Sequence, residues 1–278
     1  MSSILFAPLV LVGALAMSHT AAAAKTEPAL SRTAVASLMV DSPQGQLSVV
    51  VDSAGRFTDA SIYTAEDGST KDLVFASIAG PNWEAEDNGW IRNVNAHETR
   101  GGFSAQGLQI DLQQRLETGP IPGSYLLTQR YTMRNPTDTT IAAAMSRYLD
   151  SDILSDEGQR DIGFIPGPGA WSYLLDRSEP RADVLTQFVG IWTTGGQQRR
   201  AVVRGCCEWL AVEAIEHRMV DGDTTGDRLS DSSDDRTLTN QRTIAVPGRQ
   251  TVVYTTRTLL GRSHLSSLGE LPTGSKPD

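Results

Sequence analysis

Apolar and polar side chains alternate with a period of two residues along much of this chain, and that pattern most constrains the fold. In YLLTQRYTMRN, residues 125–135, the apolar members share one face of an extended strand: Tyr125, Leu127, Tyr131 and Met133. The polar members share the other face: Thr128, Arg130, Thr132 and Arg134. Such a strand buries one face and leaves the other to solvent. The pattern predicts antiparallel sheets packed on a core.

Turn sequences separate three pairs of such segments. NPTD at residues 135–138 precedes TTIAAAMSRYLD, and a proline and a glycine at 247–248 separate TLTNQRTIAV from QTVVYTTRTLLG. SAG at residues 53–55 separates QGQLSVVVD from RFTDASIYT. Proline fixes its own φ angle and Asp or Ser can bond to nearby backbone, so these residues indicate turns. We expect each pair to form an antiparallel hairpin.

The remaining segments indicate a sandwich. Strand-like stretches occur at residues 72–78, 89–94, 108–116, 171–175, 187–193 and 200–204. Short strands at regular spacing favour a sandwich over alternating βα units. In WLAVEAIEHRMV, helical spacing instead places four apolar residues on one stripe: Trp209, Val212, Ile215 and Met219. We predict a mostly β fold, an antiparallel β-sandwich with one short amphipathic helix over about 209–220.

The first 24 residues have the pattern of a secretory signal peptide. Residues 4–17 form an apolar run shorter than the roughly 20 residues that span a bilayer as a helix. An alanine tract at 21–24 supplies the small residues of a cleavage site, although no Lys or Arg precedes the apolar run. We expect a signal peptide at 1–24, a single β-sandwich domain at 25–262 and a disordered tail at 263–278, which is rich in Ser, Gly and Pro.

Export follows from that leader. We expect a periplasmic or extracellular bacterial protein that is not an integral membrane protein, and the strong preference for Arg over Lys is typical of a GC-rich genome. The formal net charge of −9 opposes contact with phosphate backbones, so we expect no nucleic-acid partner. Cys206 and Cys207, the only cysteines, cannot build a disulfide scaffold or a four-cysteine zinc site.

Two acidic clusters are candidate calcium loops. The first candidate ligands, in RYLDSDILSDEGQRDIG, are Asp150, Asp152 and Asp156. The second, in DGDTTGDRLSDSSDD, are Asp221, Asp223, Thr225 and Asp227, which stand at alternate positions with Gly226 available for a sharp turn. Calcium binds several convergent oxygen ligands, and neither cluster completes an EF-hand. The cofactor is therefore either calcium or none, and a solvated turn is the alternative for each cluster.

Exposed aromatic residues suggest a second kind of site. In NWEAEDNGW, Trp83 and Trp90 stand among polar and acidic residues, and His97 follows on a loop at the end of a strand. Exposed rings near carboxylates suit carbohydrate, whereas ordinary core packing is the alternative. The sequence contains no HExxH zinc motif, no GxSxG nucleophile elbow and no P-loop. We assign no catalytic residue.

Two segments carry a resemblance to a known fold. YTMRNPTDTTIAAAMSRYLDSDI and RTIAVPGRQTVVYTTRTLLG resemble the paired strands of large secreted bacterial β-sandwiches, in particular galactose mutarotases and the related supersandwich domains of carbohydrate enzymes. The resemblance covers these two segments and implies a fold. A mutarotase mechanism would imply a histidine base with a glutamate partner, and neither role maps onto a residue of this chain.

Together these observations favour an exported, non-catalytic binding or surface-associated protein of unknown ligand, supported by calcium in its acidic loops. Two alternatives stay open. One is a carbohydrate-active or carbohydrate-binding protein of the mutarotase-like type. The other is a structural subunit of an envelope assembly, which would pair through uncovered edge strands. The expected partner is accordingly a carbohydrate or another envelope protein, and enzymatic activity is left undecided.

Overall fold

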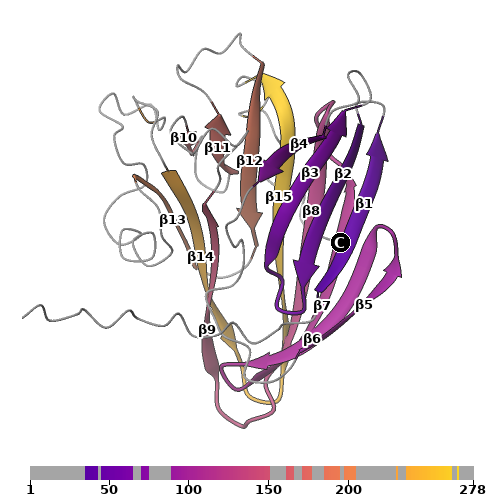
Figure 1. Ribbon diagram of the computed structural model, residues 1–278. Helices are drawn as coiled ribbons and strands as arrows, with labels where there is room; N and C mark the ends of the chain where they lie inside the picture. Colours follow the sequence, from indigo (N-terminus) through magenta and orange to yellow (C-terminus); the bar gives the residue numbers. More distant parts are fainter. Residues whose placement is uncertain are drawn as a thin grey trace, which may run out of the picture. The chain divides into compact units, whose positions relative to one another are not determined.

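Antiparallel strands arranged in three sheets make up almost all of the described chain (Figure 1). The computed structural model describes residues 35–42, 45–64, 70–74, 89–150, 161–165, 171–176, 185–194, 197–204, 230, 236–264 and 268. The chain divides into two units, Met1–Ser31 and Arg32–Asp278, and all described residues belong to the second. The predicted signal peptide and the predicted helix at 209–220 lie outside the described residues. Within the described part, no helix has the length and apolar character needed to cross a membrane.

The largest sheet has eight strands (Figure 1). Their order is β10 (Asp161–Phe164), β11 (Ser172–Asp176), β12 (Leu185–Thr193), β15 (Thr251–His264), β8 (Ser124–Arg134), β7 (Leu108–Thr118), β6 (Glu98–Ala105) and β5 (Trp90–Asn95). A four-stranded sheet has the order β1 (Val35–Ser42), β2 (Gly45–Asp52), β3 (Phe57–Thr64) and β4 (Thr70–Val74). A three-stranded sheet has the order β13 (Gln197–Arg204), β14 (Arg236–Val246) and β9 (Ile141–Asp150).

Both smaller sheets pack against one face of the eight-stranded sheet. Leu116 of β7 shares an apolar cluster with Leu38 of the four-stranded sheet. Ile110, also on β7, shares a second cluster with Met145 and Ile244 of the three-stranded sheet. Positions 110 and 116 are an even number of residues apart and therefore lie on the same face of the strand. The described chain is thus the mostly β, antiparallel sandwich that the alternating pattern predicts.

The opposite face of the eight-stranded sheet differs between its two ends. At the β10–β12 end it is covered by a third apolar cluster that includes Trp171, Phe188, Trp192 and Leu259. At the other end, strands β5 to β8 present the polar residues of their alternating pattern on this face, and exposed residues alternate with buried ones along β7 and β8. We call the outward side of β5 to β8 the open face. It carries the candidate site.

One of the three predicted hairpins is confirmed: β2 pairs with β3 across the turn at residues 53–55. The other two predictions are wrong. Strand β8 pairs with β7 and β15, whereas β9 pairs with β14, so each of the two turn sequences carries the chain from one sheet to another. The two corners lie side by side, because Nδ2 of Asn135 donates to the carbonyl oxygen of Val246 at 2.9 Å and Arg249 pairs with Asp138 at 2.7 Å.

The confirmed β2–β3 turn is buried inside the sandwich. The carbonyl oxygen of Gly55 accepts hydrogen bonds from Nε2 of Gln129 at 2.8 Å and from Nη1 of Arg147 at 2.9 Å. Gln114, which is also buried, donates to the carbonyl oxygen of Asp52 at 2.9 Å. Buried polar groups lose stability when they lack partners, so these bonds explain how a polar turn can occupy the interior.

The last strand extends beyond residue 262, where the sequence predicted the end of the domain. Strand β15 continues to His264, and Leu268 is buried, with the Tyr173 hydroxyl donating to its carbonyl oxygen at 3.2 Å. The other residues of the predicted tail at 263–278 lie outside the described residues.

Candidate functional site

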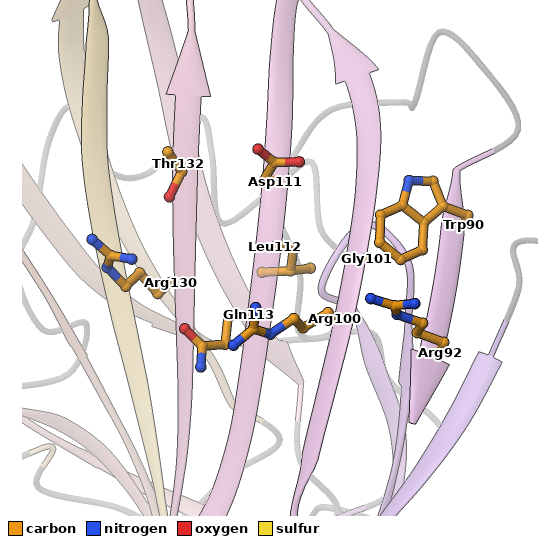
Figure 2. A pocket seen from close by; sticks show the side chains of 9 residues that line it. All are labelled: Trp90, Arg92, Arg100, Gly101, Asp111, Leu112, Gln113, Arg130 and Thr132. Atoms are coloured by element: carbon orange, nitrogen blue, oxygen red, sulfur yellow. The ribbon is translucent and has the colours of Figure 1, made fainter. Parts of the chain in front are cut away.

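A pocket of about 400 Å³ opens on the open face of the eight-stranded sheet (Figure 2). Its walls come from four consecutive strands, β5 to β8, and most of its lining side chains are polar. The polar lining side chains face outward because the alternate positions on the same strands, such as Leu112, face the buried core. The pocket is therefore a product of the same alternation that builds the sandwich.

Strand register arranges the outward-facing lining residues, together with Gly102, in two rows that run across the strands. The first, the aromatic row, consists of Trp90, Gly102, Asp111 and Thr132, each paired with the next. The second, the arginine row, consists of Arg92, Arg100, Gln113 and Arg130, paired in the same way. Four adjacent strands span about 14 Å, and rows two residues apart are separated by about 7 Å. The two rows thus form a shallow rectangular surface.

Trp90 is the aromatic part of this surface. Its side chain is 49% exposed, although it is one of the largest apolar groups of the chain. Gly102 stands opposite, and a Cβ atom at that position would lie 2.8 Å from Nε1 of Trp90. The guanidinium carbon of Arg92 lies 5.7 Å from the ring centroid, within the range of a cation–π contact. The glycine and the arginine hold an exposed indole ring in place against the sheet.

Glu98 orients part of the arginine row from just outside the pocket. Its Oε1 accepts a hydrogen bond from Nε2 of Gln113 at 2.9 Å and from Nε of Arg100 at 3.3 Å. Its side chain is 19% exposed, whereas that of Arg100 is 57% exposed. The carboxylate therefore neutralises one guanidinium group and fixes the amide beside it. Within the described part of the chain, Arg130 and Asp111 make no such hydrogen bond or ion pair.

The two carboxylates near the pocket differ in their surroundings. Glu98 pairs with Arg115, four residues along β7 from Asp111, and its carboxylate is already held by Gln113 and Arg100. Asp111 is the one carboxylate among the described lining residues, and no histidine lines the pocket there. The described lining residues offer several hydrogen-bond donors and acceptors to a ligand, with Asp111 as their one carboxylate.

His97 lies away from the pocket, in the turn between β5 and β6. Nδ1 of its ring is 2.5 Å from the carbonyl oxygen of Met39, and the backbone N–H of Met39 donates to the carbonyl oxygen of Ala96 at 2.8 Å. The ring therefore ties the β5–β6 turn to the edge of β1. Five residues of extended strand, about 16 Å, separate the turn from Trp90. The structure does not bring these two predicted ligand contacts together.

The other predicted site residues cannot be placed around a common point. Trp83, and the candidate calcium ligands Asp152, Asp156, Asp221, Asp223, Thr225 and Asp227, lie outside the described residues. Asp150 ends strand β9, and its side chain also lies outside what the structure describes. Across the described ranges, no group of three or more His, Cys, Asp or Glu side chains could hold a metal ion. Calcium binding stays a prediction.

Sequence reasoning missed most of the pocket. Arg130 and Thr132 were expected on the polar face of their strand, and they are there, but they had no expected role. Arg92, Arg100, Asp111 and Gln113 were not expected in any site. The available signal was the recurrence of arginine at outward positions of consecutive strands.

Comparisons with known proteins give a distant likeness of fold. No protein-family model and no curated protein matches the sequence. Among solved structures, a GalM/aldose epimerase homologue from C. elegans is 8% identical, with 83% of this chain and 99% of that chain covered, at a TM-score of 0.41. A putative kojibiose phosphorylase from the human microbiome is also 8% identical; 87% of this chain and 29% of that one are covered, at a TM-score of 0.37. This chain thus spans under a third of the phosphorylase. The weak mutarotase-like resemblance is one of fold, and likenesses at this level do not extend to function.

Proposed function

We propose that the chain is an exported carbohydrate-binding protein that holds a saccharide on the open face of strands β5 to β8. The observation that carries the proposal is the exposed Trp90 ring, fixed against Gly102 at one end of a polar pocket. A sugar ring presents C–H groups on its faces and hydroxyl groups around its edge. It can therefore pack on an aromatic ring while it forms hydrogen bonds with neighbouring side chains.

The side chains beside Trp90 match those hydroxyl groups. Asp111 supplies acceptors, Thr132 supplies a donor and an acceptor, and Gln113 supplies both through its amide. The pocket, at about 400 Å³, lies within the roughly 300–1,000 Å³ typical of small-molecule sites. A saccharide lying across the strands would reach both rows, since they are about 7 Å apart.

The composition of the described lining supports binding without catalysis. Hydrolysis of a glycosidic bond uses two carboxyl groups, and proton transfer at a sugar uses a positioned acid and base. Within the described lining of the pocket, Asp111 is joined by no second carboxylate and no histidine: the Glu98 carboxylate is bound by Gln113 and Arg100 outside the lining, and His97 contacts Met39. A binding role needs no such pair.

The leader pattern of residues 1–24 supports export, which would place the open face where extracellular or envelope saccharides are available. Mass spectrometry of the protein isolated from its native cells would test this part. We expect an N-terminus at Lys25 and recovery from the periplasm or the medium. An intact leader on a cytoplasmic protein would contradict it.

Binding itself can be tested with a glycan array followed by calorimetry on the strongest ligands. Trp90→Ala should weaken binding about thirtyfold, since truncating an aromatic residue that dominates a binding site costs about 2 kcal/mol. Val94→Ala is the matched control, because Val94 lies on the same strand, is also 49% exposed, and does not line the pocket. Equal loss in both variants, or no saccharide bound by the unaltered protein, would refute the proposal.

A further inference from the structure

We infer that the saccharide bound on the open face is acidic, and that its carboxylate or sulfate groups are bound by the arginine row. This inference rests on the proposed binding of a saccharide beside Trp90 and goes further by naming the ligand's chemical class. Three features carry it: the local charge, the pairing of each arginine, and the geometry of the two rows.

The charge of the pocket is opposite to that of the chain. The whole sequence has a formal net charge of −9, with 33 acidic and 24 basic residues excluding histidine. The described lining of the pocket has three arginines and one carboxylate. A locally positive surface on an acidic protein attracts anions and repels cations, and the attraction is strongest within about 10 Å at moderate salt. A neutral saccharide would make no use of this charge.

The arginines differ in how far the protein satisfies them. Arg100 pairs with Glu98 at 3.3 Å, so its charge is largely balanced. Arg92 lies over the Trp90 ring, a contact that leaves its guanidinium N–H groups available to a ligand. Arg130 makes no hydrogen bond or ion pair with any other residue in the described ranges. Two guanidinium groups in one row are thus available for an anion.

The row geometry suits a chain-like ligand. Arg92 and Arg130 stand at the two ends of the arginine row, and Figure 2 shows them on opposite sides of the pocket. They are three strand spacings, about 14 Å, apart. A saccharide of several units that crosses the strands would place one ring on Trp90 and extend acidic groups toward both arginines. The planar guanidinium fork binds carboxylate and sulfate oxygens through two parallel hydrogen bonds.

Calorimetry on three oligosaccharides of equal length would test the inference: a polygalacturonate fragment, a sulfated galactan fragment and a neutral galactan fragment. At low salt, we expect at least one of the two acidic ligands to bind about tenfold tighter than the neutral ligand. This difference in affinity should shrink as salt is added. The preferred acidic ligand identifies the anionic group as carboxylate or sulfate.

Variants connect that preference to the arginine row. Arg130→Ala should weaken binding of the acidic ligand by about three- to tenfold and binding of the neutral ligand much less. Arg92→Ala also removes the contact that holds the Trp90 ring, so it should weaken binding of both ligands, and binding of the acidic one more. Arg134→Ala is the matched control, because Arg134 lies on β8, is exposed on the same face and does not line the pocket. It should change neither.

The outcomes separate this inference from the proposed function. Equal affinity for neutral and acidic fragments, with no effect of Arg130→Ala, overturns the inference while Trp90-dependent saccharide binding stands. Binding of polyglutamate as tightly as the acidic saccharide also overturns it, since charge alone would then suffice. If no saccharide binds at all, the proposed function fails and the inference fails with it.

Discussion

Replacing Gly55 by alanine should destabilise the protein much more than an ordinary turn substitution does. Gly55 has a φ of +90°, in the left-handed region that other residues rarely adopt. It also lies inside the sandwich, where a Cβ atom would be 2.0 Å from the Tyr131 hydroxyl oxygen and 2.9 Å from Cζ of the same ring. Tyr131 is fully buried and cannot turn away without displacing the core.

Two terms give the magnitude. The left-handed conformation costs an alanine about 1–2 kcal/mol relative to glycine. Inserting a methyl group into a packed interior costs about 1–3 kcal/mol, because side chains and backbone must shift. A shift of the turn would also strain the hydrogen bonds that the Gly55 carbonyl accepts from Gln129 and Arg147. We expect Gly55→Ala to lower the free energy of unfolding by about 2–5 kcal/mol.

Urea unfolding followed by circular dichroism measures this loss, and Gly107→Ala separates the two terms. Gly107 has a φ of +74°, but a Cβ atom there would meet only Cδ1 of Ile141, at 3.7 Å, so the conformational term alone should appear. Tyr131→Phe removes the nearest clashing atom, and the double variant with Gly55→Ala should be less destabilised than the sum of its parts by about 1 kcal/mol. Equal losses in Gly55→Ala and Gly107→Ala would refute the buried position of the turn.

Two further predictions concern ionisation and metal. Burial raises the pKa of Asp52 above its ordinary 3.8, so this group's stabilising contribution is full below pH 3.8 and is lost as the pH rises through the raised pKa. Asp52→Asn keeps an acceptor for the N–H groups of Ala54 and Arg56, at 2.9 and 2.8 Å. It should flatten the decline in the free energy of unfolding that urea unfolding shows as the pH rises above 3.8, and an unchanged slope would contradict the assignment. Calcium at a hundred times its dissociation constant should stabilise the protein by about 2.7 kcal/mol if the loop at 221–227 binds it. Thermal melting with calcium and with chelator measures this stabilisation. An unchanged melting temperature would contradict calcium binding.

The sequence predicts strands best where one face is buried. Along β7 and β8 the burial alternates residue by residue, so a pattern of period two is sufficient to identify both strands and their inward faces. Strand β6 was not among the predicted strands, and it contains two adjacent glycines, Gly101 and Gly102, which weaken a strand pattern. Both glycines lie within the strand. A Cβ atom at Gly101 would be 2.6 Å from the carbonyl oxygen of Trp90, and a Cβ atom at Gly102 would meet the Trp90 ring, so both positions favour glycine. Close approach of a neighbouring strand, which is a tertiary property, explains them.

The two wrong hairpins show what turn chemistry leaves open. Proline and Asp at residues 135–138 do mark a change of direction, but a connection of this length does not choose the partner strand. That choice depends on the bond from Asn135 to Val246, a residue 111 positions away, and on the ion pair between Asp138 and Arg249. Neither contact can be inferred from the local sequence.

The pocket follows from register, which explains why alternation alone could not reveal it. The alternating pattern places Arg130 on the outward face of its strand. A shift of one residue in the pairing of β6 would turn Arg100 inward. A shift of two residues would move Arg100 by about 7 Å, into the aromatic row. Only the register between β6 and β7 is indicated by the local sequence. Gln106 and Gly107 have φ angles of 53° and 74°, as a two-residue type I′ turn requires, and Ala105 pairs with Leu108 across this turn. The β5–β6 register is shifted between Asn93 and Asn95, where the pairing is irregular, so counting residues from the turn would misplace Arg92. A binding face spread over four strands therefore becomes recognisable only when every intervening turn and bulge is known.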